Sequence, residues 1–491
     1  MTALSSATET RRITRSGAIG LAGAAVNGAF GFVLTTVIVR TFGAAGSGAL
    51  FTVIGLATIV GAVCCLGADT GLMWAIPRRD WAEVARLLPI AVLPTVALAA
   101  VVALAGFVAA GPIGRALLDD PQSTALVRLA FAGIPVIVAA TVLLAAVRAT
   151  RPVGVYVGVQ FFFVPIARPV LMVGAVVAGG GVLLGFAGWL LPLAVAAVIA
   201  LVLLGPFRRP RPADWRPFWS FALPRAASVA IDASSMWVGV LLTGALATQA
   251  EAGVFAAVGR YALAGLLIMQ GLRVAIAPQL SRLLGAGRRA EAAAVYRHTT
   301  LWIVVLSWPA YLMLAAFAPA FLRLFGSPFA AGASALVVLA LAMLVNVGVG
   351  LVQTVLLMSG NSRSHLAATV AGLALNVAAC VALIPHLGAL GAAIAWSLGI
   401  VCENVLAAAF ARRALGEPLF GPALVRAGAT VVLAAGLAVA AGLAAGGRGL
   451  PGLAVAVAVL AGGCLASLGN GRVRTLLRGV LRSVTAREVP S

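Results

Sequence analysis

Charged side chains inside long apolar runs are the residues of this sequence best placed to do chemistry. Arg168 lies in mid-run between Pro165 and Pro169, and Arg260 lies about two turns into another run. A charge in such a run costs roughly 2.5–3.5 kcal/mol on insertion scales, so each one is expected to face a partner or a water-filled space. Guanidinium groups match phosphate oxygens in a bidentate way and stay charged at any working pH. These two arginines therefore predict a site for an anionic ligand.

Other charged residues lie near the ends of the apolar runs or are acids. Arginines in this group can reach the headgroup layer with their long side chains, and they are Arg128, Arg225 and Arg273. The acids are Asp69, Asp232 and Glu403. Asp232 follows Arg225 by two helical turns, so a structural ion-pair relay that includes Arg260 is one interpretation. Coupling to H+ or Na+ through the three acids is the other.

Residues for metal or covalent chemistry are few. The five cysteines all lie in apolar runs and none has a metal-ligand spacing, so they are interpreted as packing residues. His298, His365 and His386 lie singly near the ends of runs. The acidic pair Asp119–Asp120 lies in a short loop before Pro121 and is typical of a solvated turn. We expect no metal, no cofactor and no enzymatic activity.

The composition of the chain indicates whether these charged residues belong to a soluble protein or to a membrane protein. The chain is 62% hydrophobic and 10% charged, with a mean hydropathy of +1.11. About fourteen apolar runs have the roughly 20 residues that cross a hydrocarbon core, and twelve is the nearest alternative count. The sequence therefore predicts an all-α polytopic membrane protein. The net charge of +21 does not indicate nucleic-acid binding, because no basic soluble domain with interleaved aromatic residues is present.

Orientation follows from the basic residues, all 34 of which are arginine. Threading the runs through a membrane from a cytoplasmic N-terminus places 25 of the 34 arginines on the cytoplasmic side. The opposite side receives four, and they are Arg40, Arg115, Arg323 and Arg448. We expect a protein of the inner (plasma) membrane with both termini in the cytoplasm.

A weak internal repeat divides the chain. Gly48-Ala49-Leu50-Phe51 and Gly253-Val254-Phe255-Ala256 each open a run that ends at a proline followed by a basic stretch. An even number of helices separates the copies, which predicts two parallel six-helix bundles around a central cavity. The predicted parts are a tail (1–16), the N-terminal bundle (17–205), a linker (206–220), the C-terminal bundle (221–411), two further helices (412–470) and a basic cytoplasmic tail (471–491).

Several glycine motifs resemble those of the polysaccharide transporter family, which includes O-antigen and exopolysaccharide flippases, in the multidrug/oligosaccharidyl-lipid/polysaccharide (MOP) flippase superfamily. The most specific is Leu383-Ile384-Pro385 with Gly388, Gly391-Ala392-Ala393 and Ala395. The weaker motifs are Val39-Arg40-Thr41-Phe42-Gly43 with Gly46 and Gly48, Ala252-Gly253-Val254-Phe255, Ala277-Pro278-Gln279-Leu280-Ser281 and Ser359-Gly360-Asn361-Ser362-Arg363.

The resemblance implies a flippase that moves an undecaprenyl-diphosphate-linked oligosaccharide to the outer leaflet by alternating access. In the family the cationic cavity is lined by the first, second, seventh and eighth helices. On those helices this chain carries Arg40, Arg225, Arg260, Arg273 and Asn27. A polysaccharide polymerase or glycosyltransferases are the candidate protein partners.

Three alternatives remain beside this interpretation. A lipid II flippase would carry arginines low in its first helix, whereas Arg11, Arg12 and Arg15 precede that span here. An ion-coupled multidrug exporter would need acids in the N-terminal bundle, where Asp69 is the candidate. A membrane polymerase or glycosyltransferase would need a large outer loop or paired acids at the interface.

Overall fold

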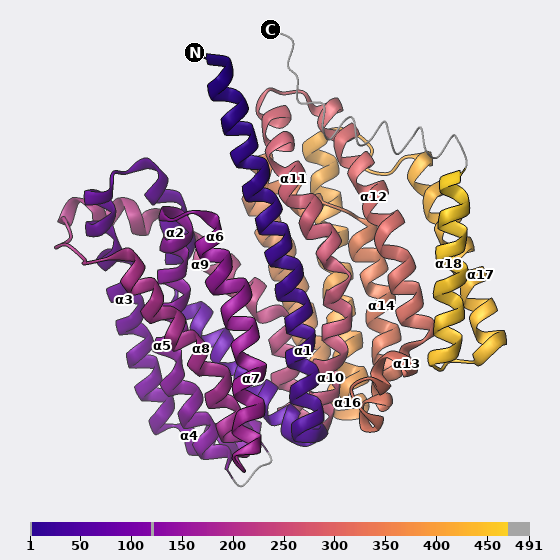
Figure 1. Ribbon diagram of the computed structural model, residues 1–491, viewed down its shortest axis with the longest axis horizontal. Helices are drawn as coiled ribbons and strands as arrows, with labels where there is room; N and C mark the ends of the chain where they lie inside the picture. Colours follow the sequence, from indigo (N-terminus) through magenta and orange to yellow (C-terminus); the bar gives the residue numbers. More distant parts are fainter. Residues whose placement is uncertain (1, 119–121, 470–491) are drawn as a thin grey trace.

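The described part of the chain is all-helical, which confirms the expected fold class. The computed structural model describes residues 2–118 and 122–469, so the predicted basic tail 471–491 lies outside it. Side chains within these ranges are described except those of residues 2–25, Arg78, Ser228, Val229, Asp232, Val274, Ala275, Pro278 and 467–469. Two groups of helices lie side by side, meet at one end and spread apart toward the end where α1 begins (Figure 1).

The first group of helices spans residues 2–204, so α1 begins inside the predicted tail 1–16, and the division of the chain into two six-helix bundles stays a prediction. Its members are α1 (Thr2–Cys64), α2 (Ala68–Ala75), α3 (Trp81–Val108), α4 (Ala110–Leu117), α5 (Ser123–Thr150), α6 (Val153–Val157), the π-helix η2 (Gly158–Phe163), α7 (Val164–Val177) and α8 (Val182–Leu204). A short 3-10 helix, η1 (Ile76–Arg78), follows α2.

The second group of helices spans residues 212–469. Its members are α9 (Pro212–Leu246), α10 (Gln249–Ala264), α11 (Leu266–Gly285), α12 (Arg289–Ala316), α13 (Ala318–Arg323), η3 (Ser327–Gly332), α14 (Ala333–Gly348), α15 (Val352–Met358), α16 (Ser362–Leu415), α17 (Pro422–Gly446) and α18 (Leu450–Gly469). The helix α9 begins earlier than the predicted boundary at 221, because Pro212 suits a first turn that needs no backbone N–H donor.

Nine helices in the described ranges are long and apolar enough to cross a membrane, or ten if α10 and the bent start of α11 form one span. Two of them are long enough for two crossings of roughly 20 residues each. The apolar stretch Val26–Cys64 of α1 has 39 residues and α16 has 54. Each contains one glycine with non-helical backbone, Gly43 in α1 and Gly388 in α16. The count of fourteen treats each of these helices as two crossings, and it stays a prediction.

The turn at Gly388, in the motif with the highest specificity, requires glycine for two reasons. Its φ is +53°, a value that L side chains rarely adopt, and an added Cβ would lie 1.4 Å from Oε2 of Glu251. That oxygen accepts a hydrogen bond from the backbone N–H of Ala389 at 2.9 Å. The Glu251 carboxylate of α10 therefore caps the second half of α16, where backbone N–H groups lack helical partners.

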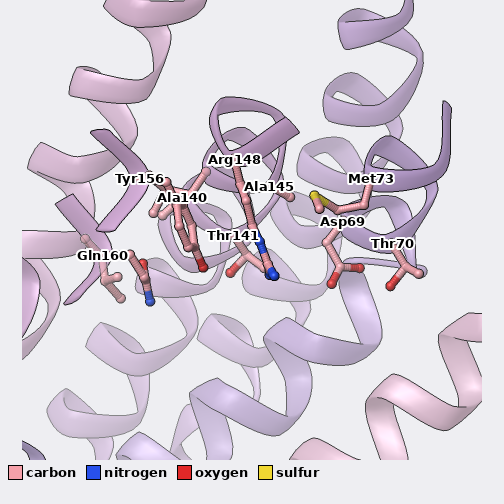
Figure 2. A pocket seen from close by; sticks show the side chains of 11 residues that line it. Asp69, Thr70, Met73, Ala140, Thr141, Ala145, Arg148, Tyr156 and Gln160 are labelled. Carbon is pink, nitrogen blue, oxygen red and sulfur yellow. The ribbon is translucent and has the colours of Figure 1, made fainter. Parts of the chain in front are cut away.

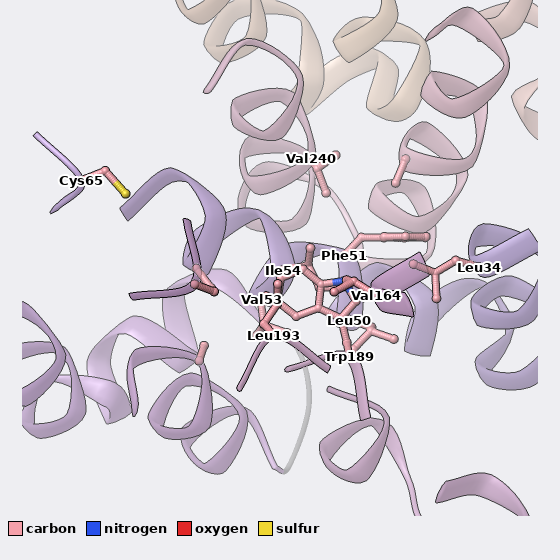
Figure 3. Close-up of a cluster of buried hydrophobic side chains, with 14 of the residues drawn as sticks. Leu34, Leu50, Phe51, Val53, Ile54, Cys65, Val164, Trp189, Leu193 and Val240 are labelled. Carbon is pink, nitrogen blue, oxygen red and sulfur yellow. The ribbon is translucent and has the colours of Figure 1, made fainter. Parts of the chain in front are cut away.

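A shared apolar core holds the first group to α9 of the second. Figure 3 shows part of it, with Leu50, Phe51 and Ile54 of α1 near Trp189 of α8 and Val240 of α9. The helix α9 packs against both α1 and α16. It therefore joins the two groups.

Candidate functional site

The two groups of helices meet where the motif that begins at Gly48 contacts the motif that begins at Gly253. A Cβ on Gly48 of α1 would lie 1.7 Å from the carbonyl oxygen of Gln249 and 3.0 Å from the backbone nitrogen of Gly253. A Cβ on Gly253 of α10 would lie 2.3 Å from the carbonyl oxygen of Ala44. Only glycine permits backbones to approach this closely. We call this pairing of Gly48 with Gly253 the closing contact.

A buried glutamine fastens the closing contact. Gln249 is 5% exposed, and its Oε1 accepts a hydrogen bond from Oγ1 of Thr52 at 3.3 Å. Its Nε2 donates to the carbonyl of Leu117 at 2.6 Å and to that of Gly244 at 3.2 Å. Because Thr52 and Leu117 belong to the first group of helices, one side chain of the second group is bonded to two elements of the first.

Arg168 lies on α7, partly buried, against an aromatic ring of the neighbouring helix. Its Cζ is 4.2 Å from the centre of the Trp189 ring, and its Nε donates to the Trp189 carbonyl at 3.2 Å. The helices α7 and α8 approach closely here, because Gly188 leaves room for the backbone of Leu171. The ring face carries partial negative charge, so it stabilises the guanidinium without neutralising it.

Arg260 lies on α10 in a similar setting. Its Cζ is 5.8 Å from the centre of the Trp237 ring, and its buried Nε has no hydrogen-bond partner among the described residues. Trp237 of α9 is held in place by Gly55, where an added Cβ would lie 3.0 Å from the indole ring. The guanidinium therefore keeps hydrogen-bonding capacity that the described protein groups leave unused.

The two arginines act on each other although they belong to different groups of helices. Their guanidinium groups are like charges within electrostatic range, although burial affects Arg168 more than Arg260 does. The ion pairs that the structure describes are Arg79 with Asp214 and Arg288 with Glu291, so neither guanidinium takes part in one of them. Two repelling cations in an apolar setting are stabilised when an anion binds between them.

The other predicted cationic residues have separate surroundings. Arg40 donates from Nε and Nη2 to the carbonyl of Leu324, at 3.1 and 2.8 Å. Arg225 is exposed and its Cζ lies 4.7 Å from the centre of the Phe221 ring, and Nη2 of Arg273 donates to Oε1 of Gln270. Arg128 and Asn27 are exposed. The structure thus brings Arg168 and Arg260 within electrostatic range of each other. Arg40 instead bonds the second group of helices through the Leu324 carbonyl, and the contacts of Arg225 and Arg273 lie within their own helices.

The three predicted acids differ in what surrounds them. Oε1 of Glu403 accepts hydrogen bonds from Nε2 of Gln353 at 2.7 Å and from Oγ1 of Thr369 at 3.1 Å. Asp69 has a buried Oδ1 with no hydrogen-bond partner in the described part of the chain. The side chain of Asp232 lies outside the described residues, so the predicted relay with Arg225 and Arg260 stays a prediction.

A polar cavity of about 390 Å³ lies inside the first group of helices. Its polar lining comes from Asp69 and Thr70 of α2, Thr141 and Arg148 of α5, Tyr156 of α6 and Gln160 of η2. Figure 2 shows the ends of the Gln160, Tyr156, Arg148 and Asp69 side chains pointing in the same direction. A second cavity, of about 620 Å³ and lined by apolar residues, lies between α5, α7 and α8. Neither cavity is lined by Arg168 or Arg260.

Several partners of these residues were not predicted from the sequence. Trp189 and Trp237 lie 21 and 23 positions from the arginines that contact them, so no short motif links each pair. The contribution of Tyr156 and Gln160 to the lining of the polar cavity was also not predicted from the sequence. The signal in the sequence was Pro165, which has no backbone N–H and whose ring would clash with the carbonyl of residue 161 in a regular helix. The helix before Pro165 takes the wider π form.

Comparison with known proteins places this geometry in a transporter fold. The family model MatE matches residues 224–382. No curated protein matches the sequence. Solved structures match over most of their length, although the sequence identity is low.

Three of these structures illustrate the fold. The lipid II flippase MurJ in an inward closed conformation has a TM-score of 0.73 at 10% identity, covering 92% of this chain and 98% of that one. An inward-facing multidrug resistance MATE family transporter has a TM-score of 0.63 at 17% identity, covering 80% and 95%. A MOP superfamily transporter from Pyrococcus furiosus, described as having a binding pocket of reverse polarity, has a TM-score of 0.59 at 18% identity, covering 83% and 96%. This chain has the fold of MOP-superfamily transporters.

Proposed function

We propose that this protein is a flippase that moves an undecaprenyl-diphosphate-linked oligosaccharide from the inner to the outer leaflet by alternating access. The observation that carries the proposal is the pair Arg168 and Arg260. These are two guanidiniums from opposite groups of helices, each beside a tryptophan ring, that repel each other. A diphosphate offers oxygens to both, and charge-assisted bonds of this kind are about twice as strong as neutral ones.

The positive charge of Arg168 and Arg260 distinguishes a flippase of anionic lipids from an exporter of cationic drugs. A lipophilic cation, the expected substrate of many drug exporters, would meet two positive groups at this place and be repelled. An anionic lipid head would instead relieve the repulsion between Arg168 and Arg260. The MurJ-like fold also favours a lipid-linked substrate, since that protein is described as a lipid II flippase. Lipid II is the second candidate substrate, and the charge pair fits its diphosphate equally well.

The closing contact supports alternating access. With the N-terminus in the cytoplasm, as the arginine distribution predicts, Gly48 and Gly253 would seal the outer side and the spread end would admit substrate from the inner leaflet. Outward opening would then require Gln249 to release Thr52 and Leu117. Asp69, Asp232 and Glu403 are the candidates for H+ or Na+ coupling of that step. A polymerase or glycosyltransferases would supply or consume the oligosaccharide.

The test is a flipping assay in vesicles that carry a fluorescent lipid-linked oligosaccharide. We expect Arg168→Ala and Arg260→Ala each to lower the rate at least about tenfold, since a bond to a charged group contributes about 1.5–3 kcal/mol. Arg128→Ala is the matched control, because Arg128 also lies on an aromatic ring, 5.2 Å from the centre of Phe107, but at an exposed position. Wild-type rates in both site variants would rule the proposal out.

A further inference from the structure

The polar cavity inside the first group of helices has a chemical character that the flippase proposal does not use. One carboxylate (Asp69) and one guanidinium (Arg148) line it, so the two formal charges on its walls cancel. A bare cation would meet Arg148 and a bare anion would meet Asp69. The balance of charge favours a ligand without net charge.

The neutral groups on the walls outnumber the charged ones. The Tyr156 phenol, the Gln160 amide and the Thr70 hydroxyl can each donate and accept hydrogen bonds, whereas Asp69 only accepts and Arg148 only donates. A ligand must therefore present donors and acceptors together. Hydroxyl groups meet this requirement at every position, because each hydroxyl does both.

One residue that lines the polar cavity, Asp69, has a hydrogen-bond acceptor that is not used. Oδ1 of Asp69 is buried and has no partner among the described residues. A buried acceptor left unsatisfied costs about 1–3 kcal/mol, or more when it is charged. The helix is also widened where it carries Gln160, since Gly158–Phe163 is a π-helix, a feature that is frequent at functional sites.

We propose that this cavity binds a saccharide. Its volume of about 390 Å³ falls in the range of roughly 300–1,000 Å³ that is usual for small-molecule sites. The saccharide is either part of the transported lipid or a free sugar from the cytoplasm, and the first case rests on the proposed function. Gln160 and Arg168 are eight residues apart on consecutive helical segments, about 12 Å along the axis. A diphosphate at Arg168 could thus carry its attached sugars toward Gln160.

The test measures equilibrium binding to the full-length protein in lipid nanodiscs. The probes are undecaprenyl diphosphate, the same lipid carrying glucose, galactose or N-acetylglucosamine, and the three free sugars. The variants are Gln160→Leu and Asp69→Asn, with Gln279→Leu as the matched control because Gln279 is exposed and outside the cavity. Thermal unfolding of each unliganded variant checks that it folds, and Ala145→Phe, which fills the cavity, is a second route to the same loss.

We expect at least one sugar-bearing lipid to bind about tenfold more tightly than undecaprenyl diphosphate, and the site variants to abolish the difference while the control keeps it. Binding of a free sugar that the same variants abolish, without a difference among the lipids, would assign the cavity to a free saccharide. If no probe distinguishes the wild type from Gln160→Leu, Asp69→Asn or Ala145→Phe, the proposal is overturned. The flippase proposal fails separately, if undecaprenyl diphosphate itself does not bind or binds Arg168→Ala equally well.

Discussion

The closing contact gives the prediction with the clearest geometry, the substitution Gly48→Ala. The new Cβ would lie 1.7 Å from the carbonyl oxygen of Gln249, whereas carbon–oxygen contacts are normally about 3.3 Å or longer. The two backbones would have to move apart by about 1.6 Å. Since the obstacle is a backbone carbonyl, no side-chain rotation can relieve it.

The expected magnitude follows from the cost of overpacking, about 1–3 kcal/mol. A cost of this size, confined to the closed form, shifts the equilibrium between closed and separated forms by roughly 5- to 150-fold. Gly253→Ala should act in the same direction, because its Cβ would lie 2.3 Å from the carbonyl oxygen of Ala44. Gly31→Ala, on the same helix as Gly48, is the control, since nothing lies within 4 Å of its added Cβ.

The assay is a distance measurement between spin labels at two exposed positions beside the closing contact. Cysteines at Ala45 and Ala245 carry the labels, and the accessible native residues Cys402 and Cys464 are replaced by serine. We expect a longer distance to dominate in Gly48→Ala and Gly253→Ala, and the wild-type distribution in Gly31→Ala. Unchanged distributions in both of the first two variants would refute the assignment of this contact as the seal.

Two further predictions concern the second group of helices. Gly388→Ala should lower the unfolding midpoint in a thermal scan more than Gly436→Ala, because the φ of +53° and the Glu251 carboxylate both oppose a side chain at position 388, whereas Gly436 of α17 has no positive φ and nothing within 4 Å of its added Cβ. An equal midpoint in the two variants would contradict the account of this turn. Glu403→Gln should abolish flipping driven by an H+ or Na+ gradient while leaving exchange without a gradient intact, since the amide keeps the shape of the side chain but loses its charge. Gradient-driven flipping at the wild-type rate would remove Glu403 from the coupling candidates.

The sequence pattern predicted the helical class, because that class depends on long apolar runs, whereas the repeat inferred from glycine positions stays a prediction. Gly48 and Gly253 were matched as equivalent positions, and the structure shows them in contact. Gly388 was identified within a motif, but its partner Glu251 could not be, since 137 residues separate them.

Side-chain partners were beyond the reach of the sequence for a similar reason. The cost of a buried charge singled out Arg168 and Arg260 without stating which groups would surround them. Arg40 was placed in the cationic set by its helix, yet its guanidinium bonds a backbone carbonyl whose position depends on the turn after α13. Asp69 was noted as a lone acid, and only the fold reveals the polar cavity that it shares with Arg148.

The most direct test of the account is whether the partly buried residues Arg168 and Arg260 recognise the charge of a lipid head. The measurement compares the affinity of undecaprenyl diphosphate with that of uncharged undecaprenol, for the wild type and for the double variant Arg168→Ala/Arg260→Ala. We predict that the wild type favours the diphosphate by at least about tenfold and that the double variant shows no preference. An equal preference in the two proteins would contradict the account.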